Sequence, residues 1–188
     1  ASIWSSTTPA PPMPIAKAVY FDSGTSALSA CMRVAADKVM PGRLAGESEV
    51  IVPAYACPDL VSAAVHARLR PVLVDIARDR PWLDLDQLKQ NISDKTVAVV
   101  AVNFLGLGER WQQLRQICRE AGVVLIEDSA QYFPADSTAF SLHGDMASFS
   151  FGRGKPVSLL GGGAAITQDP DLSVALNKSA VSAEPGSP

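Results

Sequence analysis

Lys155 lies in the stretch of this sequence that best combines a reactive side chain with small neighbours. It follows Ser150 by five residues within ASFSFGRGKPVSLLGGG, which spans 147–163. A lysine amine that is tuned by its surroundings can attack a carbonyl carbon and form a Schiff base. Most lysines in globular proteins are instead solvated surface residues. The reactivity of Lys155 therefore depends on what the rest of the chain places around it.

An acidic pair, Glu127 and Asp128, closes the apolar run 123–126, and Gln131 follows it. A carboxylate at the end of a buried strand needs a cationic or hydrogen-bonding partner. A helix N-cap or a surface salt bridge would supply one. The functional interpretation is that Asp128 pairs with a cationic ring nitrogen, while Gln131, one helical step away, bonds a neighbouring oxygen.

Small residues follow the first apolar run, AVYF at 18–21, in the segment DSGTSAL. A strand, a turn at Gly24, Thr25 and Ser26, and the start of a helix would present free backbone N–H groups at the positive end of the helix dipole. The two hydroxyls add donors, and this arrangement suits a phosphate group. An ordinary Ser/Thr N-cap without an anion is the alternative.

These stretches must be positioned by a regular alternation of elements. Strands are predicted at 18–21, 50–53, 71–76, 97–102, 123–126, 147–151 and 164–167. Helices are predicted to open near residue 22, at 59–69, 85–92 and 109–121, and after 169. Such alternation predicts an α/β fold with a mostly parallel sheet covered by helices. Ligands of such sheets bind at the carboxyl ends of the strands.

Composition excludes several classes of protein. The 188 residues are 47% hydrophobic and 19% charged, which indicates one globular domain, and the net charge of −3 gives no sign of nucleic-acid binding. No apolar run is long enough to span a membrane. The three cysteines have no CxxC spacing and indicate a reducing cytoplasm instead of a zinc site or disulfide framework. His66 and His143 have no partner at metal-ligand spacing and are expected to be structural or surface residues.

Other motifs of the sequence do not complete a known site. GRGK lacks the first glycine and the Ser/Thr of a phosphate-binding P-loop. Gly106 and Gly108 are not followed by a third glycine at 111, which is Trp, and no GxSxG elbow is present. Nucleotide-binding, dehydrogenase and hydrolase functions are therefore not favoured.

The order SGTSAL, VIVPAY, VVLIEDSAQ, GDMASFSFGRGK and GGGAAIT resembles the DegT/StrS-type sugar aminotransferases, which depend on pyridoxal 5′-phosphate (PLP). The resemblance covers about residues 16–168. It implies the aspartate-aminotransferase-like fold, that is, the large domain of PLP-dependent transferase fold type I with a seven-stranded, mostly parallel sheet. We predict an irregular N-terminal arm at 1–15, a PLP-binding large domain at 16–178 and a flexible end at 179–188. We expect the small C-terminal domain of the family to be absent from this sequence.

The resemblance also implies roles for single residues. Lys155 matches the lysine that binds PLP as a Schiff base, and Asp128 matches the aspartate that pairs with the pyridinium nitrogen. Gln131 matches the glutamine near the ring hydroxyl. The residues that match the phosphate cradle are Gly24, Thr25, Ser26 and Ser150. The implied reaction moves an amino group from an amino-acid donor to a nucleotide-linked keto-sugar, in a cytoplasmic homodimer without nucleic-acid or membrane partners. Relatives with a histidine in place of the lysine perform dehydration, and Lys155 argues against that reaction.

The sequence also departs from the family pattern. Ala56 and Cys57 stand where the family often has an aromatic residue that stacks on the PLP ring, and 103–107 reads NFLGL in place of an HLYGQ-like segment. Another PLP reaction, that of an aldolase or a desulfurase, is one alternative function. A desulfurase needs a mobile, reactive cysteine, whereas Cys57 beside a proline is expected to be packed. A truncated or non-catalytic relative that serves as a binding or assembly module is a second alternative.

Overall fold

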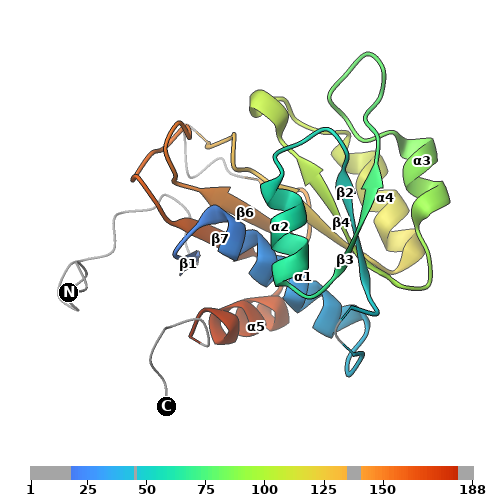
Figure 1. The fold of residues 1–188 in the computed structure, drawn as a ribbon, viewed down its shortest axis with the longest axis horizontal. Helices are drawn as coiled ribbons and strands as arrows, with labels where there is room; N and C mark the ends of the chain where they lie inside the picture. The colour runs from blue at the N-terminus through green and yellow to red at the C-terminus, as the bar shows by residue number, and fades with distance from the viewer. Residues whose placement is uncertain (1–17, 45, 135–140, 182–188) are drawn as a thin grey trace.

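The computed structural model describes residues 18–44, 46–134 and 141–181. Within them, seven strands form one sheet in the order β1-β7-β6-β5-β4-β2-β3 (Figure 1). Their bounds are β1 (Val19–Phe21), β2 (Glu49–Pro53), β3 (Arg70–Val74), β4 (Thr96–Val102), β5 (Val124–Asp128), β6 (Met146–Ser150) and β7 (Gly163–Thr167). β7 is antiparallel to both of its neighbours, β1 and β6, and the other strand pairs are parallel. The predicted seven-stranded, mostly parallel sheet is confirmed.

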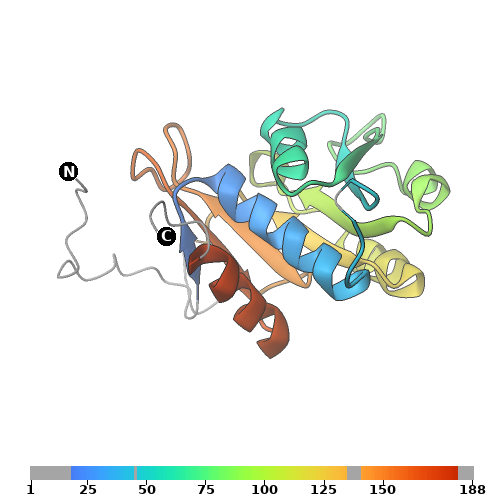
Figure 2. The same ribbon diagram turned by 60° about the horizontal axis from the view of Figure 1, so that its bottom comes forward.

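Helices cover both faces of this sheet (Figure 2). They are α1 (Gly24–Val39), α2 (Asp59–His66), α3 (Leu85–Asn91), α4 (Trp111–Ala121) and α5 (Pro170–Val181), with a short 3₁₀ helix η1 (Phe104–Gly106) after β4. α1, α2 and α5 share one hydrophobic core with one face of the strands, and α3 and α4 share another with the opposite face. Alternation explains the division, because Val50 and Val52 of β2 face the first core while Ile51 faces the second.

Local signals set the ends of several helices. Ser23 caps α1 and Asp84 caps α3, each by accepting hydrogen bonds from backbone N–H groups of the first turn. Gly122, predicted to end its helix, follows α4 in the left-handed conformation with φ 69°.

Several predicted boundaries differ from the structure. β3 ends at Val74, and Ile76 forms an isolated bridge with Leu83 instead of extending the strand. The helix predicted at 59–69 ends at His66, because the chain turns sharply after Ala67. The helix predicted from 109 begins at Trp111, since the Glu109 side chain accepts a hydrogen bond from the N–H of Leu83, in the loop before α3.

The ends of the predicted domain are only partly described. α5 continues to Val181, whereas we predicted a flexible end from 179. The predicted arm at 1–15 lies outside the described residues. Of the helices that the structure describes, none has the length and apolar character needed to cross a membrane.

Candidate active site at the carboxyl ends of β5 and β6

Asp128 is the last residue of β5, and it lies beside β6 with Ser148 as its register partner. Its side chain is only 5% exposed. Oδ1 accepts a hydrogen bond from the Ala130 N–H at 2.9 Å, and the Asp128 carbonyl accepts one from the Asn103 N–H at 2.9 Å. The carboxylate is therefore fixed at the edge of the sheet where parallel strands end, as the sequence predicted.

Burial dominates the electrostatics of Asp128. Loss of solvent raises the pKa of its carboxyl, while the Ala130 amide and the positive charge of Lys155 lower it, and the charge of Asp59 raises it. The net direction is upward. A buried carboxyl in this state gains from any nearby cation, and Lys155 belongs to its electrostatic surroundings. The structure thus brings Asp128 and Lys155 into one site.

Lys155 lies on the connection between β6 and β7. Two backbone hydrogen bonds close this connection, from Phe151 N–H to the Gly162 carbonyl at 2.9 Å and from Leu159 N–H to the Phe151 carbonyl at 2.8 Å. The lysine is half-buried and follows Gly154, whose φ of 74° allows the tight turn. The turn places Lys155 at the carboxyl end of β6, next to the end of β5.

The start of α1 packs against the end of β6. A Cβ added to Gly24 would lie 2.5 Å from Ser150 Cβ and 2.8 Å from Ser150 Oγ, so only glycine fits here. The Ser26 N–H is bound to the capping Ser23 Oγ at 3.0 Å, which is the ordinary N-cap that the sequence allowed. The amides of Gly24 and Thr25 belong to the first turn and have no acceptor within the helix. These two amides and the Ser150 hydroxyl form a small cradle that suits an anion.

We expect Gly24→Ala to push α1 away from β6. The clash with Ser150 should lower the free energy of unfolding by about 1–3 kcal/mol and weaken the binding of inorganic phosphate, because overpacking separates the two sides of the cradle. Thermal unfolding and a phosphate titration measure the two effects. The control is Gly161→Ala, since no atom lies within 4 Å of a Cβ at that position. Equal phosphate affinity of Gly24→Ala and Gly161→Ala would contradict the cradle.

Gln131 lies in a turn instead of the predicted helical step. The Tyr132 N–H bonds the Ser129 carbonyl, and no helix begins here among the described residues. Gln131 Oε1 accepts a hydrogen bond from the Leu105 N–H at 2.8 Å, and Leu105 has a left-handed φ of 52°. The side-chain oxygen therefore holds η1 against β5, and the Nε2 group is the end that could donate to a ring hydroxyl.

Glu127 precedes Asp128 in β5, so its side chain points to the opposite face of the sheet. Its Oε1 accepts hydrogen bonds from the His143 and Gly144 N–H groups, and its Oε2 lies 3.6 Å from His143 Nδ1. Burial raises the pKa of the Glu127 carboxyl, against the lowering effect of the two amides. His143 also stacks on Trp111, with ring centroids 5.4 Å apart. This part of the acidic pair is structural, and so is His143.

The departures from the family pattern lie together at the same edge of the sheet. Tyr55 after β2 and Phe104 after β4 are in ring contact, with centroids 5.7 Å apart. Cys57 is exposed, so the expectation that it is packed is wrong. It lies in the turn before α2, next to the N-cap residue Pro58. Cys31 and Cys118 are buried, and burial raises the pKa of each thiol to about 12.

Two residues of the site were missed by sequence reasoning. Asn103 is 6% exposed, follows β4, and donates from Nδ2 to Ser129 Oγ at 2.9 Å. Asp59 opens α2, and its charge acts on Asp128. Asn103 had the same signal as Asp128, a polar residue directly after a continuous apolar strand. Asp59 had no signal beyond its place at a helix start.

A second buried acid, Glu109, lies in the loop before α4 and is 7% exposed. Oε1 accepts from the Leu83 N–H at 3.1 Å, while Oε2 has no partner within the described protein. Burial raises the pKa of Glu109 to about 7, against the lowering effects of Arg110 and the Leu83 amide. An acid whose folded-state pKa is raised stabilises the fold at low pH, and this contribution is lost as pH rises through the folded pKa.

We therefore expect Glu109→Gln to change how stability depends on pH. Between pH 5 and pH 8 the native chain should lose about 2–3 kcal/mol of unfolding free energy relative to the variant. Urea unfolding at both pH values measures the difference. Glu120→Gln, at an exposed position of α4, is the matched control. If Glu109→Gln and Glu120→Gln show the same pH dependence, Glu109 does not titrate in this range.

Residues 14–180 of the chain match the model of the DegT/DnrJ/EryC1/StrS aminotransferase family. One sequence relative is the dTDP-3-amino-3,4,6-trideoxy-alpha-D-glucose transaminase of Micromonospora megalomicea subsp. nigra, 30% identical over 167 residues. The match covers 87% of this chain and 43% of the relative. The chain spans less than half the length of the curated relatives it matches.

Solved structures give the same picture. DesV of S. venezuelae is 28% identical with a TM-score of 0.72, and the match covers 85% of this chain and 42% of DesV. Spr1654 of Streptococcus pneumoniae, a candidate sugar aminotransferase in its PLP form, is 26% identical with a TM-score of 0.72. That match covers 86% of this chain and 44% of Spr1654.

Proposed function

Because the chain belongs to the DegT/DnrJ/EryC1/StrS aminotransferase family, we propose that it is the large domain of a PLP-dependent aminotransferase. The donor is an amino acid and the acceptor a nucleotide-linked keto-sugar. The observation that carries the proposal is the buried carboxyl of Asp128, with Lys155 acting on it, at the strand ends where ligands of such sheets bind. The nucleotide-linked acceptor is supported by the dTDP-sugar transaminase among the relatives.

The residues at this edge fit PLP. The Gly24 and Thr25 amides with the Ser150 hydroxyl suit its phosphate, and the close approach of Gly24 to Ser150 leaves no room for a side chain there. The Asp128 carboxyl suits a protonated ring nitrogen, because a cation compensates its burial. Ser26 and Gln131 complete the proposed cofactor-binding set. When bound, PLP would supply an electron sink for charge that develops at the donor carbon.

Each side chain then has one task in the reaction. Asp128, held by the Ala130 amide, would supply the negative charge that keeps the ring nitrogen of PLP protonated. The Lys155 amine lies on a short turn closed by backbone hydrogen bonds, and it takes and returns the proton at the α-carbon of the donor. Gln131 fixes the loop after β4 through the Leu105 amide and so shapes one side of the site.

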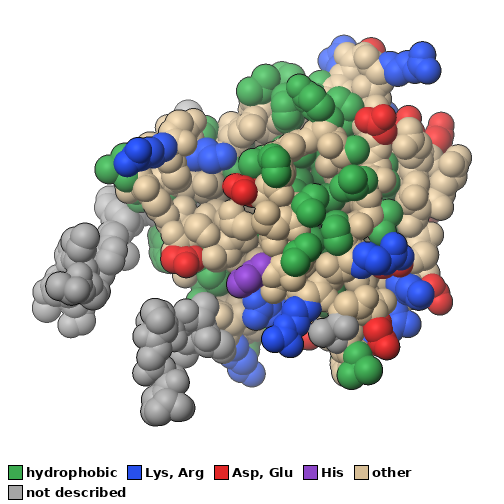
Figure 3. Space-filling view, viewed as in Figure 1, with side chains coloured by type: hydrophobic (Ala, Val, Ile, Leu, Met, Phe, Trp, Pro, Cys, Tyr) green, Lys and Arg blue, Asp and Glu red, His purple; other side chains and the backbone are tan. Residues whose placement is uncertain are grey.

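Dimer formation is also part of the proposal. Hydrophobic side chains gather over α2 and β3 (Figure 3), where Val61, Val65 and Leu73 are exposed. Exposed apolar patches of this kind mark interaction surfaces. The proposed partner at this patch is a second copy of the chain, which would make the protein a homodimer. Sedimentation at several protein concentrations tests whether the dimer forms. The free thiols of Cys31, Cys57 and Cys118 support a reducing compartment, which we propose is the cytoplasm.

A single-turnover assay tests the proposed function. The PLP-loaded chain is mixed with glutamate or glutamine, and the keto acid that forms is measured, with and without a nucleotide-linked keto-sugar. Keto acid in an amount equal to bound PLP supports an aminotransferase. PLP binding without keto acid would favour the non-catalytic module. Conversion of cysteine to alanine, with the sulfur transferred to a protein thiol as a persulfide, would favour a desulfurase, for which exposed Cys57 leaves room.

A further inference from the structure

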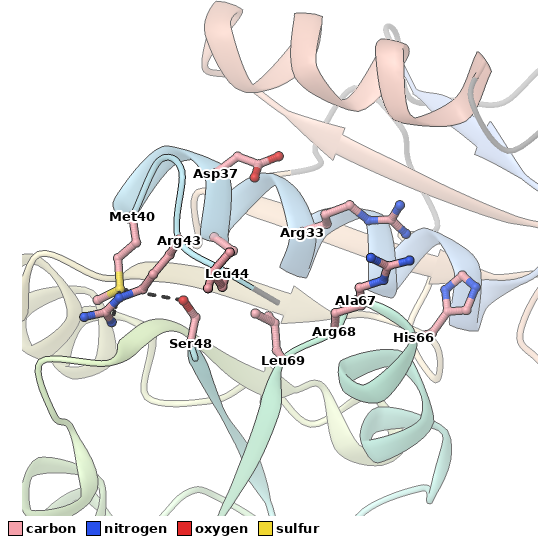
Figure 4. Close-up of a pocket in the computed structure, with 11 residues that line it drawn as sticks. Arg33, Asp37, Met40, Arg43, Leu44, Ser48, His66, Ala67, Arg68 and Leu69 are labelled. Carbon is pink, nitrogen blue, oxygen red and sulfur yellow. Dashed lines mark hydrogen bonds between the residues drawn. The ribbon is translucent and has the colours of Figure 1, made fainter. Parts of the chain in front are cut away.

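A cleft lies at the opposite edge of the sheet from Asp128 and Lys155. Its volume is about 490 Å³, and it is bordered by the second half of α1, the loop before β2 and the turn after α2 (Figure 4). Arg33 lies nine residues after the first residue of α1, which is about 14 Å along the helix axis. The cleft is therefore separate from the proposed PLP cradle.

Charge on the walls of this cleft is mostly positive. Three arginines line it, Arg33, Arg43 and Arg68, against one carboxylate, Asp37. Within the described chain, neither Arg33 nor Arg68 forms an ion pair. Figure 4 shows the two side chains, one from α1 and one from the turn after α2, extending toward the same part of the cleft. Two unpaired guanidinium groups that converge in this way favour an anion.

Arg68 occupies a backbone position that favours glycine. After α2, the Arg68 N–H bonds the Val65 carbonyl and the Leu69 N–H bonds the Ala64 carbonyl, both at 2.9 Å. This is the Schellman arrangement, whose left-handed residue is usually glycine. Arg68 has a φ of 60°, and its carbonyl is held by the Gly46 N–H at 2.8 Å.

The end of α4 gives a direct comparison within the same chain. There Gly122 has a φ of 69°, with the Gly122 N–H bonded to the Arg119 carbonyl and the Val123 N–H to the Cys118 carbonyl. The two helix ends have the same hydrogen-bond pattern, but one carries glycine and the other arginine. An arginine in the last turn of α2 would complement the helix dipole equally well without a left-handed residue. The strain at Arg68 therefore points to a use for its side chain.

We propose that this arginine cleft, defined by Arg33, Arg43 and Arg68, binds a small molecule that carries a diphosphate group. Guanidinium forks bind phosphate oxygens in pairs, which suits the convergence of Arg33 and Arg68. The volume is that of a typical small-molecule site. Ser48 and His66 also line the cleft. The remaining side chains of its lining are apolar and could contact an organic body, and they are Ala36, Met40, Leu44, Ala67 and Leu69. The diphosphate is either free pyrophosphate or part of a nucleotide.

Arg68→Gly separates a binding role from a structural one. We expect this variant to bind pyrophosphate about tenfold more weakly, as loss of one charge-assisted contact predicts. It should at the same time melt about 2–4 °C higher, because glycine relieves the left-handed backbone. Arg33→Gln should weaken binding to a similar extent, whereas Arg78→Gln, at an exposed position in the loop after β3, should not.

Amide NMR of the 188-residue chain, titrated with pyrophosphate and with UDP, locates the binding. We expect shifts at Gly46, Arg68 and Leu69. Equal affinities would assign recognition to the diphosphate alone, and tighter UDP binding would add the nucleoside, so both results support the site and separate the two sources. Shifts confined to Gly24, Thr25 and Ser26 would overturn the proposal. So would a lower melting temperature of Arg68→Gly, or native affinity in Arg33→Gln.

Discussion

Lys155→Ala is expected to abolish covalent attachment of PLP to this chain. The native protein, mixed with PLP and reduced with borohydride, should carry the label on the peptide that contains Lys155. In the variant that peptide has no amine to attach, although the Gly24–Ser150 cradle remains. Amino transfer from the donor should fall by about 10²–10⁴-fold, because the group that moves the α-proton is lost.

Lys95→Ala is the matched control for this experiment, since Lys95 is exposed at the opposite edge of the sheet, just before β4. It should be labelled and active like the native chain. A label on any lysine other than Lys155 in the native protein would contradict the assignment. Reversible PLP binding that persists in Lys155→Ala is expected, because the proposed phosphate contacts, from the Gly24 and Thr25 amides and the Ser150 hydroxyl, do not involve the lysine.

Asp128→Asn is expected to lower amino transfer by about 10²–10³-fold, the cost of removing one preorganised electrostatic contact in a buried site. The amide has nearly the shape of the carboxyl and can still accept from the Ala130 N–H. It has no negative charge to keep a proton on the nitrogen of the cofactor. Asp79→Asn, in the exposed loop after β3, should leave activity unchanged.

Stability should change in the opposite direction from activity. Burial raises the pKa of Asp128, so ionisation of this group weakens the cofactor-free fold as pH rises through the folded pKa. Asp128→Asn should therefore be more stable than the native chain at neutral pH, and the gain should shrink as pH falls toward the ordinary pKa of an aspartate and be absent below it. Urea unfolding of both proteins without PLP measures this. A variant that is less stable at pH 7 would show that the carboxylate supports the fold.

Continuous apolar runs made the fold readable from the sequence. VAVVAV at 97–102 matches a strand whose first residues are buried on both faces. The apolar run at 123–126 predicts a buried strand with Asp128 at its carboxyl end, and Asp128 is the last residue of β5. These signals are local and depend on residue type alone. Asn103 carries the same local signal, because it is a polar residue directly after the continuous apolar strand β4.

Features that depend on distant contacts were not predictable in this way. The Gln131 side chain bonds Leu105, a residue on another loop, and Glu109 leaves its helix to bind Leu83. The residues around Leu105 and Leu83 in the sequence give no sign of either contact. Cys57 was expected to be packed because a proline follows it, but the exposure of a side chain depends on residues that are distant in sequence. Arg68 has a left-handed backbone conformation at a helix end, where sequence rules predict glycine.

The sheet order has a consequence for how the chain folds. β1 is made first, yet it pairs with β7, the last strand, and a Cβ on Gly163 of β7 would lie 2.4 Å from the Ser23 carbonyl. Among the strands that the structure describes, β1 therefore pairs with one that is synthesised more than 140 residues later. Joining Gly24 to Ser150 closes a loop of about 125 residues, with an entropic cost on the order of 4 kcal/mol. Contacts this far apart in sequence also slow folding. An anion held jointly by the Gly24 and Thr25 amides and the Ser150 hydroxyl would bind only the folded chain. It would therefore stabilise the contact between the start of α1 and the end of β6.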